Sequence, residues 1–366
     1  MNRKLKIGII GCGGIANKKH MPSLAQLSDL CQMTAFCDLI PERAEAAAKS
    51  YGTVDAKTYT DYKDLLKDET IDVVHILTPN VYHAPLTIDA FAAGKHVMCE
   101  KPMAITSADA QAMINAAKKA GKKFTIGYQN RFREDAQTLH RACEQGALGE
   151  IYFAKAHALR RRGVPTWGVF PNKALQGGGP LIDIGTHALD LTLWCMNNYE
   201  PEAVMGSVFC KMADKWEGNL FGPYSPETYE VEDSAFGFVR MKNGATIFLE
   251  SSWALNLTDT KEACTTLCGT EGGAEMFNGP QGNGFNLKFN TAKYGKLIDE
   301  TPKLGQGGVA YFEGGNAAPG YLEAKSWLNS ILNDTDPVVL PEQALVVTKI
   351  LEAIYRANET RSIIHL

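Results

Sequence analysis

Strand and helix patterns alternate through the first 127 residues of this 366-residue chain. Helical patterns, such as the alanine-rich one that opens with Pro41 and the one over residues 107–120, separate short apolar runs. Those runs predict buried strands at residues 5–10, 33–37, 72–77, 95–99 and 123–127. Strands that alternate with helices predict a parallel, doubly wound sheet with right-handed crossovers. The expected class of this part is therefore α/β.

The pattern changes after residue 127. Strand patterns now follow one another near residues 150–161, 203–210, 234–241, 245–253 and 265–268. A glycine-rich helix is expected at 178–196, and two more close the chain at 321–332 and 342–358, after a glycine-rich loop at 305–320. Such a run predicts an α+β domain with a large, mostly antiparallel open sheet. We therefore expect two domains, residues 1–127 and 128–366.

Charge and composition exclude several classes of partner. The chain has 37 basic and 41 acidic residues, so it lacks the basic field that attracts nucleic acid or anionic lipid. No segment approaches the roughly 20 apolar residues that span a membrane, and the N-terminus is a poor secretory signal. The nine cysteines are scattered without a Cys-x-x-Cys pair. These features predict a cytoplasmic protein with reduced cysteines and no metal site.

A glycine-rich turn follows the first strand. Gly11-Cys12-Gly13-Gly14-Ile15-Ala16 fits the pattern Gly-x-Gly-x-x-Ala. In a dinucleotide-binding turn, Gly11 permits the tight bend and Gly13 lets the backbone approach a pyrophosphate. The start of the next helix then faces the phosphates with its partial positive charge. We expect Gly11, Gly13, Gly14 and Ile15 to contact a dinucleotide; a plain strand-to-helix turn is the alternative.

The end of the second strand carries Asp38. An acid at this place accepts hydrogen bonds from the ribose hydroxyls and repels a 2′-phosphate, which favours NAD over NADP. Arg43, five residues later, weakens this preference because an arginine can accommodate the extra phosphate.

Two further segments follow strands of the same sheet. Thr78-Pro79-Asn80 comes after residues 72–77, and Glu100-Lys101-Pro102 comes after residues 95–99. Ligands of such sheets bind beyond the carboxyl ends of the strands, so Thr78, Asn80, Glu100 and Lys101 are expected to line the cofactor groove. His83 is expected there too, with an ordinary histidine at a helix start as a close alternative. Lys101 is also a candidate catalytic cation.

The second domain contains a glycine-rich run, Gly177-Gly178-Gly179-Pro180, ahead of Asp183 and His187. Glycine lets a chain approach a ligand closely, and proline suits the first turn of a helix. Asp183 and His187 are four residues apart and therefore share one helical face. Alone, such a pair is more often structural than catalytic, but a lysine at the edge of a nucleotide-binding sheet makes catalysis the stronger interpretation.

With these motifs together, the chain resembles the Gfo/Idh/MocA family of sugar and cyclitol dehydrogenases nearly from end to end. The resemblance rests on Gly11–Ala16, Asp38, Thr78–Asn80, Glu100–Pro102, Gly127–Phe132 and Asp183 with His187. It implies an N-terminal Rossmann domain and a C-terminal α/β domain whose open sheet often forms oligomer interfaces. It also implies that Gln129 contacts the cofactor, and that Tyr128, Asn130 and Arg131 lie near the nicotinamide and the substrate.

The resemblance further implies that Lys101, Asp183 and His187 form the catalytic set. Oxidation of a secondary alcohol sends hydride to NAD while a proton leaves the hydroxyl. Histidine has a pKa near the working pH, so His187 suits the general base. Lys101 suits stabilisation of the developing alkoxide. Asp183 suits binding of a substrate hydroxyl or orientation of the cation.

Arg160-Arg161-Arg162 and Trp167, just before the glycine run, are expected to choose the substrate. One or two of the arginines, with Arg160 and Arg162 as candidates, point inward if successive strand residues alternate, and Trp167 is placed to stack on a pyranose face. Trp253 and Asn256 either close the pocket or, for Trp253, belong to the core.

The style of this segment resembles the branch that acts on glucosides, so carbon 3 of a glucoside is the favoured position of oxidation. A free sugar or an inositol is the alternative within the class. Two other classes stay open. An NAD-dependent glycosidase releases sugar without accumulating NADH, and a non-enzymatic NAD-binding regulator lacks the catalytic set.

Overall fold

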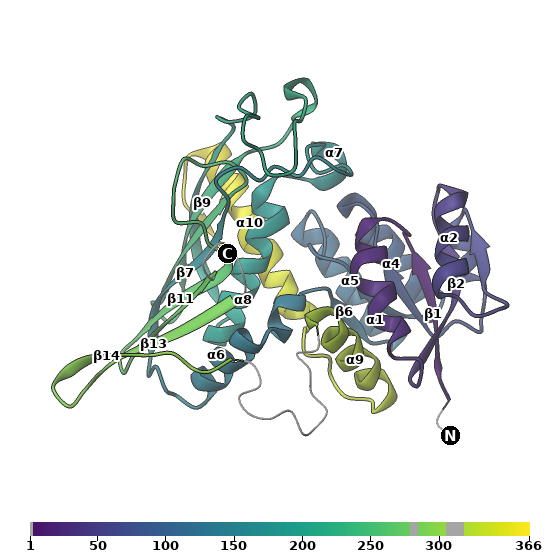
Figure 1. Cartoon of the computed structure of the whole chain (residues 1–366), viewed down its shortest axis with the longest axis horizontal. Coiled ribbons are helices and arrows are strands. Elements are labelled where there is room, and N and C mark those ends of the chain that lie inside the picture. Colours follow the sequence, from purple (N-terminus) through teal and green to yellow (C-terminus); the bar gives the residue numbers. More distant parts are fainter. Residues whose placement is uncertain (1–2, 279–284, 305–317) are drawn as a thin grey trace. The chain divides into compact units, whose positions relative to one another are not determined.

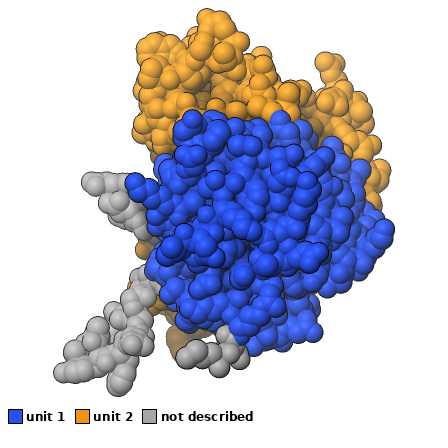
Figure 2. All heavy atoms as spheres, turned by 90° about the vertical axis from the view of Figure 1, so that its right-hand side faces the viewer, with its two compact units in different colours: residues 1–129, 317–345 blue, residues 130–316, 346–366 orange. Residues whose placement is uncertain are grey.

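The computed structural model describes residues 3–278, 285–304 and 318–366. The chain divides into two compact units (Figure 2). Unit 1 consists of residues 1–129 with 317–345, and unit 2 consists of residues 130–316 with 346–366.

Unit 1 contains a six-stranded parallel sheet (Figure 1). Its strand order, β3-β2-β1-β4-β5-β6, is that of a Rossmann sheet, with the order reversing between β1 and β4. The strands are β1 Leu5–Ile10, β2 Cys31–Cys37, β3 Lys57–Tyr59, β4 Val73–Ile76, β5 His96–Cys99 and β6 Phe124–Ile126. The predicted α/β class is confirmed. The strand β3 was not predicted, because its three residues, of which Lys57 and Thr58 are exposed, carry no apolar pattern.

The helices of unit 1 begin and end where local sequence signals place them. Pro41 is the first residue of α2 (Pro41–Tyr51), where its missing N–H costs nothing. At α5 (Ser107–Ala120), the Thr106 side chain accepts a hydrogen bond from the Asp109 amide, and Gly121 ends the helix with a positive φ. The other helices are η1 Ala16–His20, α1 Met21–Ala25, α3 Tyr62–Leu66, η2 Asn80–Tyr82, α4 His83–Ala92 and α9 Pro319–Leu332.

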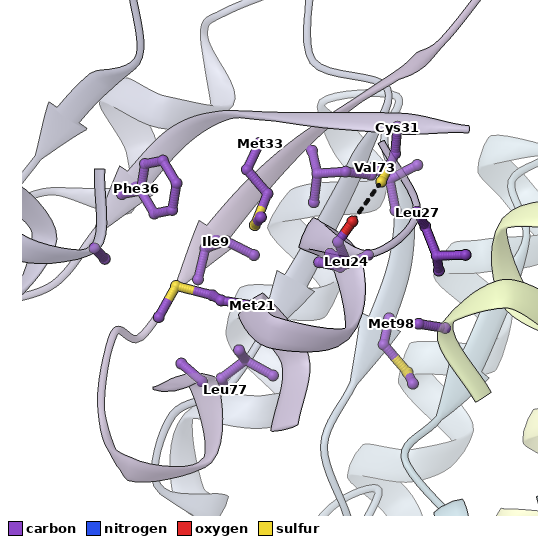
Figure 3. Packing of buried hydrophobic residues seen from close by; sticks show 14 of the residues in the cluster. Ile9, Met21, Leu24, Leu27, Cys31, Met33, Phe36, Val73, Leu77 and Met98 are labelled. Carbon is purple, nitrogen blue, oxygen red and sulfur yellow. Dashed lines mark hydrogen bonds between the residues drawn. The ribbon is translucent and has the colours of Figure 1, made fainter. Parts of the chain in front are cut away.

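The core of unit 1 joins residues from opposite ends of the chain. Buried side chains of β1, β2 and α1 pack together, among them Ile9, Phe36 and Leu24 (Figure 3). Trp327 and Leu328 of α9 belong to the same cluster and are almost fully buried. This contact explains why residues 317–345 group with unit 1, whereas the predicted boundary assigned everything after residue 127 to the second domain. Apolar periodicity predicts that a segment is a helix, but it does not predict which domain core the helix packs into.

Unit 2 contains a nine-stranded sheet in the order β14-β13-β12-β11-β7-β10-β9-β8-β15 (Figure 1). Neighbouring strands are antiparallel except for β7 and β10, which pair in parallel. The strands are β7 Ile151–Leu159, β8 Pro201–Phe209, β9 Ser234–Met241, β10 Thr246–Ser252, β11 Glu262–Gly269, β12 Gly273–Asn278, β13 Phe285–Lys293, β14 Lys296–Glu300 and β15 Ile364–His365. The predicted mostly antiparallel sheet is confirmed.

One face of this sheet carries helices (Figure 1). Ile354 of α10 (Pro341–Thr360) fills the space over Gly206 and Gly237, where an added Cβ would lie 2.7 and 2.5 Å from its atoms. The other helices of this region are η3 Gln129–Phe132, α6 Glu134–Glu144, α7 Lys173–Gln176, η4 Leu181–Gly185, α8 Thr186–Met196 and η5 Pro226–Thr228.

Among the described residues, every helix is too short or too polar to cross a membrane. The predicted loop at residues 305–320 falls almost wholly outside the described part of the chain.

Candidate active site

The glycine-rich turn of unit 1 has one tight glycine and two open ones. Gly11 has a φ of +94°, and a Cβ there would lie 2.5 Å from the Leu77 carbonyl oxygen. Around Gly13 and Gly14, in contrast, a Cβ would meet nothing within 4 Å. The Asn17 side chain fixes the turn by donating to the carbonyls of Cys12 and Gly13. The open backbone at Gly13 and Gly14, followed by the half-exposed Ile15, fits the approach of a pyrophosphate.

Asp38 is held by backbone amides on both sides. Its Oδ2 accepts from the Cys12 N–H at 2.9 Å, and its Oδ1 accepts from the Ile40 N–H at 2.9 Å. The carboxylate therefore has a fixed place beside the glycine turn, and each oxygen retains a lone pair for a ribose hydroxyl. Arg43 lies exposed in the first turn of α2. That Arg43 can accommodate the 2′-phosphate of NADP stays a prediction.

The next edge segments are tied together by His83. This side chain is fully buried; its Nδ1 lies 2.7 Å from the Pro102 carbonyl oxygen and its Nε2 lies 3.0 Å from the Thr78 carbonyl oxygen. His83 thus links the segment after β4 to the segment after β5. This arrangement favours a structural role over the predicted direct contact with a cofactor. Asn80, at the start of η2, is half-buried.

Glu100 lies at the centre of a buried ionic network. Its Oε1 lies 2.5 Å from Lys19 Nζ and 2.7 Å from His20 Nε2, and its Oε2 accepts from the Lys101 N–H at 3.1 Å. Lys19 also pairs with Glu323 of α9 at 3.0 Å and donates to the Gln129 side chain. Behind it, His20 Nδ1 lies 3.1 Å from His75 Nδ1. We name these residues the Glu100 network: Lys19, His20, His75, Glu100 and Glu323.

Burial and neighbouring charges shift the pKa values of the Glu100 network, upward for Glu323 and downward for His20 and Glu100. Burial, opposed by Lys19, raises the pKa of Glu323 to about 7. Burial together with the Lys19 charge lowers the pKa of His20 to about 4, although Glu100 acts in the other direction. For Glu100, burial favours the neutral form, but Lys19 and His20 outweigh it and hold its pKa well below the usual range. The network therefore keeps Glu100 ionised next to Lys101.

This placement changes the interpretation of Glu100. It was predicted to bind the cofactor, but its carboxylate is 7% exposed and already accepts three bonds from the protein. This geometry indicates that the Glu100 side chain positions the turn formed by Glu100, Lys101 and Pro102. Lys101 itself is half-buried, and Tyr128 is buried at the end of unit 1.

In unit 2, Asp183 and His187 share the accessible side of one helical segment. Asp183 belongs to η4 and His187 to the first turn of α8. Both are half-buried, while every other residue from 181 to 190 is buried. Asp183 Oδ2 accepts a hydrogen bond of 3.0 Å from Nε1 of Trp253, which is fully buried in the core. Trp253 thus packs inside and orients Asp183 at the same time.

The glycines before Asp183 serve packing rather than access for a ligand, contrary to the prediction. A Cβ at Gly178 would collide with the Tyr355 hydroxyl, and one at Gly179 would lie 2.3 Å from the Glu232 carbonyl oxygen. The buried Glu232 carboxylate accepts from the amides of Gly179 and Leu181 and from Tyr355. This contact pins the segment that precedes Asp183.

Arg131 was predicted to bind substrate, and the structure contradicts this role. Its guanidinium is fully buried and makes a bidentate ion pair with Asp190, at 3.0 Å and 2.6 Å. It also lies over the Trp194 ring at 5.5 Å. A buried charge of this kind joins η3 to α8 and has no face left for a sugar. Asn130, its neighbour, is half-buried and stays a candidate.

Two arginines of the run Arg160-Arg161-Arg162 also have partners within the protein. Arg160 makes a bidentate pair with Glu262, at 2.6 and 2.5 Å, which neutralises its charge. Burial opposes the charged form of Arg160, but Glu262 and then Asp183 raise its pKa above the usual value. Arg162 donates to the Asn256 side chain at 2.7 Å. Trp167 is 49% exposed and available to a ligand.

Comparison with known proteins identifies the fold. A family model described as an oxidoreductase family with an NAD-binding Rossmann fold matches residues 5–128, and the GFO/IDH/MocA C-terminal domain matches residues 136–275. The chain belongs to the Gfo/Idh/MocA family of oxidoreductases. The predicted resemblance and the prediction of an NAD-dependent dehydrogenase are therefore confirmed at the level of the family.

Individual members of the Gfo/Idh/MocA family match over different lengths. The D-glucoside 3-dehydrogenase of Escherichia coli is 34% identical over 99% of this chain and 97% of its own. The inositol 2-dehydrogenase of Salmonella typhimurium is 33% identical, but only over 53% of this chain and 55% of its own. Among solved structures, the aldose-aldose oxidoreductase of Caulobacter crescentus, in complex with glycerol, superposes with a TM-score of 0.81 at 27% identity over both whole chains.

The residues of unit 1 fit the NAD of this family. The open backbone at Gly13 and Gly14 and the oriented Asp38 carboxylate are the two features that a dinucleotide needs at a Rossmann edge. The sequence did not predict the Glu100 network or the Glu232 contact. The only local signal was a lysine and a histidine directly after the glycine turn, and their acidic partners lie 80 or more residues away.

Proposed function

We propose that this chain oxidises a secondary ring hydroxyl of a sugar or glycoside with NAD, with carbon 3 of a glucoside as the favoured position. The observation that carries the proposal is the whole-length similarity to a D-glucoside 3-dehydrogenase, in a chain that retains Lys101, Asp183 and His187. The match to an inositol 2-dehydrogenase covers only about half of either chain, which makes a cyclitol the second choice.

In the proposed reaction, NAD held by the glycine turn and Asp38 would supply the hydride acceptor for the ring carbon. His187 takes the proton from the hydroxyl on that carbon, and the C–O bond becomes a carbonyl. Lys101 donates to the same oxygen and stabilises its negative charge as the proton leaves. Asp183, oriented by Trp253, holds a neighbouring hydroxyl of the ring. The sum is one ketone, one NADH and one proton per hydroxyl oxidised.

Both Lys101 and Asp183 are held by neighbouring residues in a way that suits these roles. The Lys101 amide donates to a carboxylate that the Glu100 network holds ionised, so the turn that carries this lysine is fixed by buried bonds. The Asp183 carboxylate is oriented by Trp253 and is half-buried, so part of it is accessible to a hydroxyl of the substrate. Preorganised groups of this kind lower the cost of reaching the transition state.

The test is an absorbance assay at 340 nm with NAD and a panel of methyl glucoside, glucose and myo-inositol. NADH formed with the glucoside supports the proposal, while NADH formed only with the inositol moves the chain to the cyclitol class. Free sugar released without NADH indicates a glycosidase, and NAD binding without turnover indicates a regulator. Either of the last two results rejects the proposal.

We also propose that the chain forms a homo-oligomer through the open face of the sheet in unit 2. On the side of the sheet away from Ile354, Phe238 contacts Phe248 at 5.3 Å between ring centroids, and Phe248 contacts Phe153 at 5.4 Å. Phe238 and Phe248 are 41% and 38% exposed, an apolar face that a second copy would cover. Light scattering should show a multimer that Phe248→Glu dissociates and that Val54→Glu, at an exposed place in unit 1, leaves intact.

A further inference from the structure

Two loops of unit 2 present large apolar side chains outward. The loops cover residues 160–172 and 211–230 and lie near α7 (Figure 1). Trp167 is 49% exposed, Phe221 41% and Leu220 77%. Isolated apolar residues at a surface are common, but a group on two adjoining loops is typical of a binding surface.

Hydrogen bonds hold the two loops to each other. The Asn219 side chain accepts from the Val164 N–H at 2.8 Å and donates to the Val164 carbonyl at 3.0 Å. Thr166 Oγ1 donates to the Phe221 carbonyl at 2.6 Å. A surface fixed in this way loses little entropy when a ligand binds, so its exposed rings are preorganised.

The exposed rings connect inward to the proposed site through a series of ring contacts. Trp167 stands nearly perpendicular to Phe221, at 4.8 Å and 87°, and contacts Phe170 at 5.9 Å. Phe170 in turn contacts Trp253 at 6.3 Å. Trp253 donates to Asp183. Trp167 and Phe221 therefore belong to a layer outside the residues that would hold the reacting ring.

The polar surroundings of this layer favour a neutral ligand group. The Arg160 guanidinium lies over the Phe221 ring at 5.8 Å, and its charge is already matched by Glu262. The cation fixes the ring by a cation–π contact and offers little net charge to an anion. An uncharged aromatic group is the chemistry that these rings recognise.

We propose that Trp167 and Phe221 form a subsite for the aglycone of a glycoside, with preference for aromatic aglycones over a methyl group or a free hydroxyl. The inference rests on the proposed function, since it assigns Asp183 to the sugar ring. It replaces the expected stacking of Trp167 on the pyranose itself. The aglycone, attached at the anomeric carbon, extends outward along the rings while the sugar occupies the inner layer.

The test compares phenyl β-glucoside, methyl β-glucoside and glucose in the wild type, in Trp167→Ala, in Phe221→Ala and in the control Tyr294→Ala, which removes an exposed ring from the turn between β13 and β14. We expect the wild type to favour the phenyl glucoside in kcat/KM. The ratio of kcat/KM for phenyl glucoside to that for methyl glucoside should fall about 10-fold in Trp167→Ala, which corresponds to the loss of an aromatic contact of about 1.4 kcal/mol. The control should keep the wild-type ratio.

A ratio that Trp167→Ala and Phe221→Ala leave unchanged overturns the inference, even if all glucosides are oxidised. Calorimetric binding of phenyl glucoside to the NADH-loaded protein separates this failure from that of the proposed reaction. Binding that Trp167→Ala weakens, without turnover, supports the subsite and rejects only the reaction. A change of oligomer mass in Trp167→Ala, with binding unaltered, assigns the surface to a second copy of the chain and overturns the inference.

Discussion

Lys101 in unit 1 and Asp183 in unit 2 are supported in different ways. Behind Lys101 lies the Glu100 network, in which buried polar and charged side chains bond to one another. Asp183 instead accepts a hydrogen bond from the Trp253 indole, and the aromatic series from Trp253 to Trp167 leads from it into exposed loops. Buried ion pairs tolerate little change, whereas loop rings can vary without loss of the fold. We therefore expect the proposed cofactor side of the chain to tolerate few substitutions, and substrate choice to depend on the loops of unit 2.

The largest expected effect is on stability. Glu100→Ala leaves the Lys19 and His20 side chains without their shared carboxylate, which should cost about 3–5 kcal/mol in the free energy of unfolding. Urea unfolding of the whole chain, followed by far-ultraviolet circular dichroism, measures it. Glu42→Ala, at an exposed place in α2, is the matched control. If both variants unfold at the same urea concentration, the Glu100 network does not stabilise unit 1.

The next effect is on turnover. Lys101→Met removes the proposed donor to the alkoxide and should lower kcat about 10²- to 10³-fold, as loss of an oxyanion donor does. NADH binding should persist, because the glycine turn and Asp38 remain. Lys118→Met, on the exposed part of α5, serves as the control. Wild-type turnover in Lys101→Met would remove this lysine from the mechanism.

A smaller effect is expected on cofactor choice. Asp38→Ala should lower kcat/KM for NAD about 10- to 100-fold, since a hydrogen bond to a charged group contributes about 1.5–3 kcal/mol. Asp38→Asn keeps acceptor oxygen for the Cys12 amide but loses the charge, so it should narrow the preference for NAD over NADP. An unchanged ratio of the two cofactors in Asp38→Asn would show that the charge does not select NAD.

The smallest effect is a dependence on pH. Burial raises the pKa of Glu323 from its usual 4.5 to about 7, with Lys19 and Glu100 as its charged neighbours. The folded state therefore binds this proton more tightly than the unfolded state, so its stability falls as pH rises through that window. Relative to Glu323→Gln, the wild type should lose free energy of unfolding over this range. A difference that stays constant with pH would contradict the shift.

Sequence predicted the parts of the fold that depend on local signals. The strands that end just before Gly11, Thr78 and Glu100 were predicted from the sequence. An apolar run followed by a polar motif is a local signal, and it marks the carboxyl end of a strand. The helix at residues 107–120 was predicted to the residue, since Thr106 and Gly121 mark its ends.

The remaining parts depend on contacts between distant residues. Lys19 meets Glu323, more than 300 residues away, and α9 enters the core of unit 1 although the chain has passed through unit 2 in between. Neither contact follows a local period. Arg131 was misassigned for the same reason, since its partner Asp190 lies 59 residues further on. The glycines at 178 and 179 were assigned to a ligand because their neighbours Tyr355 and Glu232 could not be foreseen.

The central claim, oxidation at carbon 3 of a glucoside by NAD, is tested most directly with a substrate that carries deuterium at that carbon. After incubation of methyl [3-²H]glucoside with the protein and NAD, mass spectrometry of the NADH reports whether the label has moved. The account predicts deuterated NADH and a glucoside with a ketone at carbon 3. Unlabelled NADH, or consumption of the glucoside without any NADH, would contradict it.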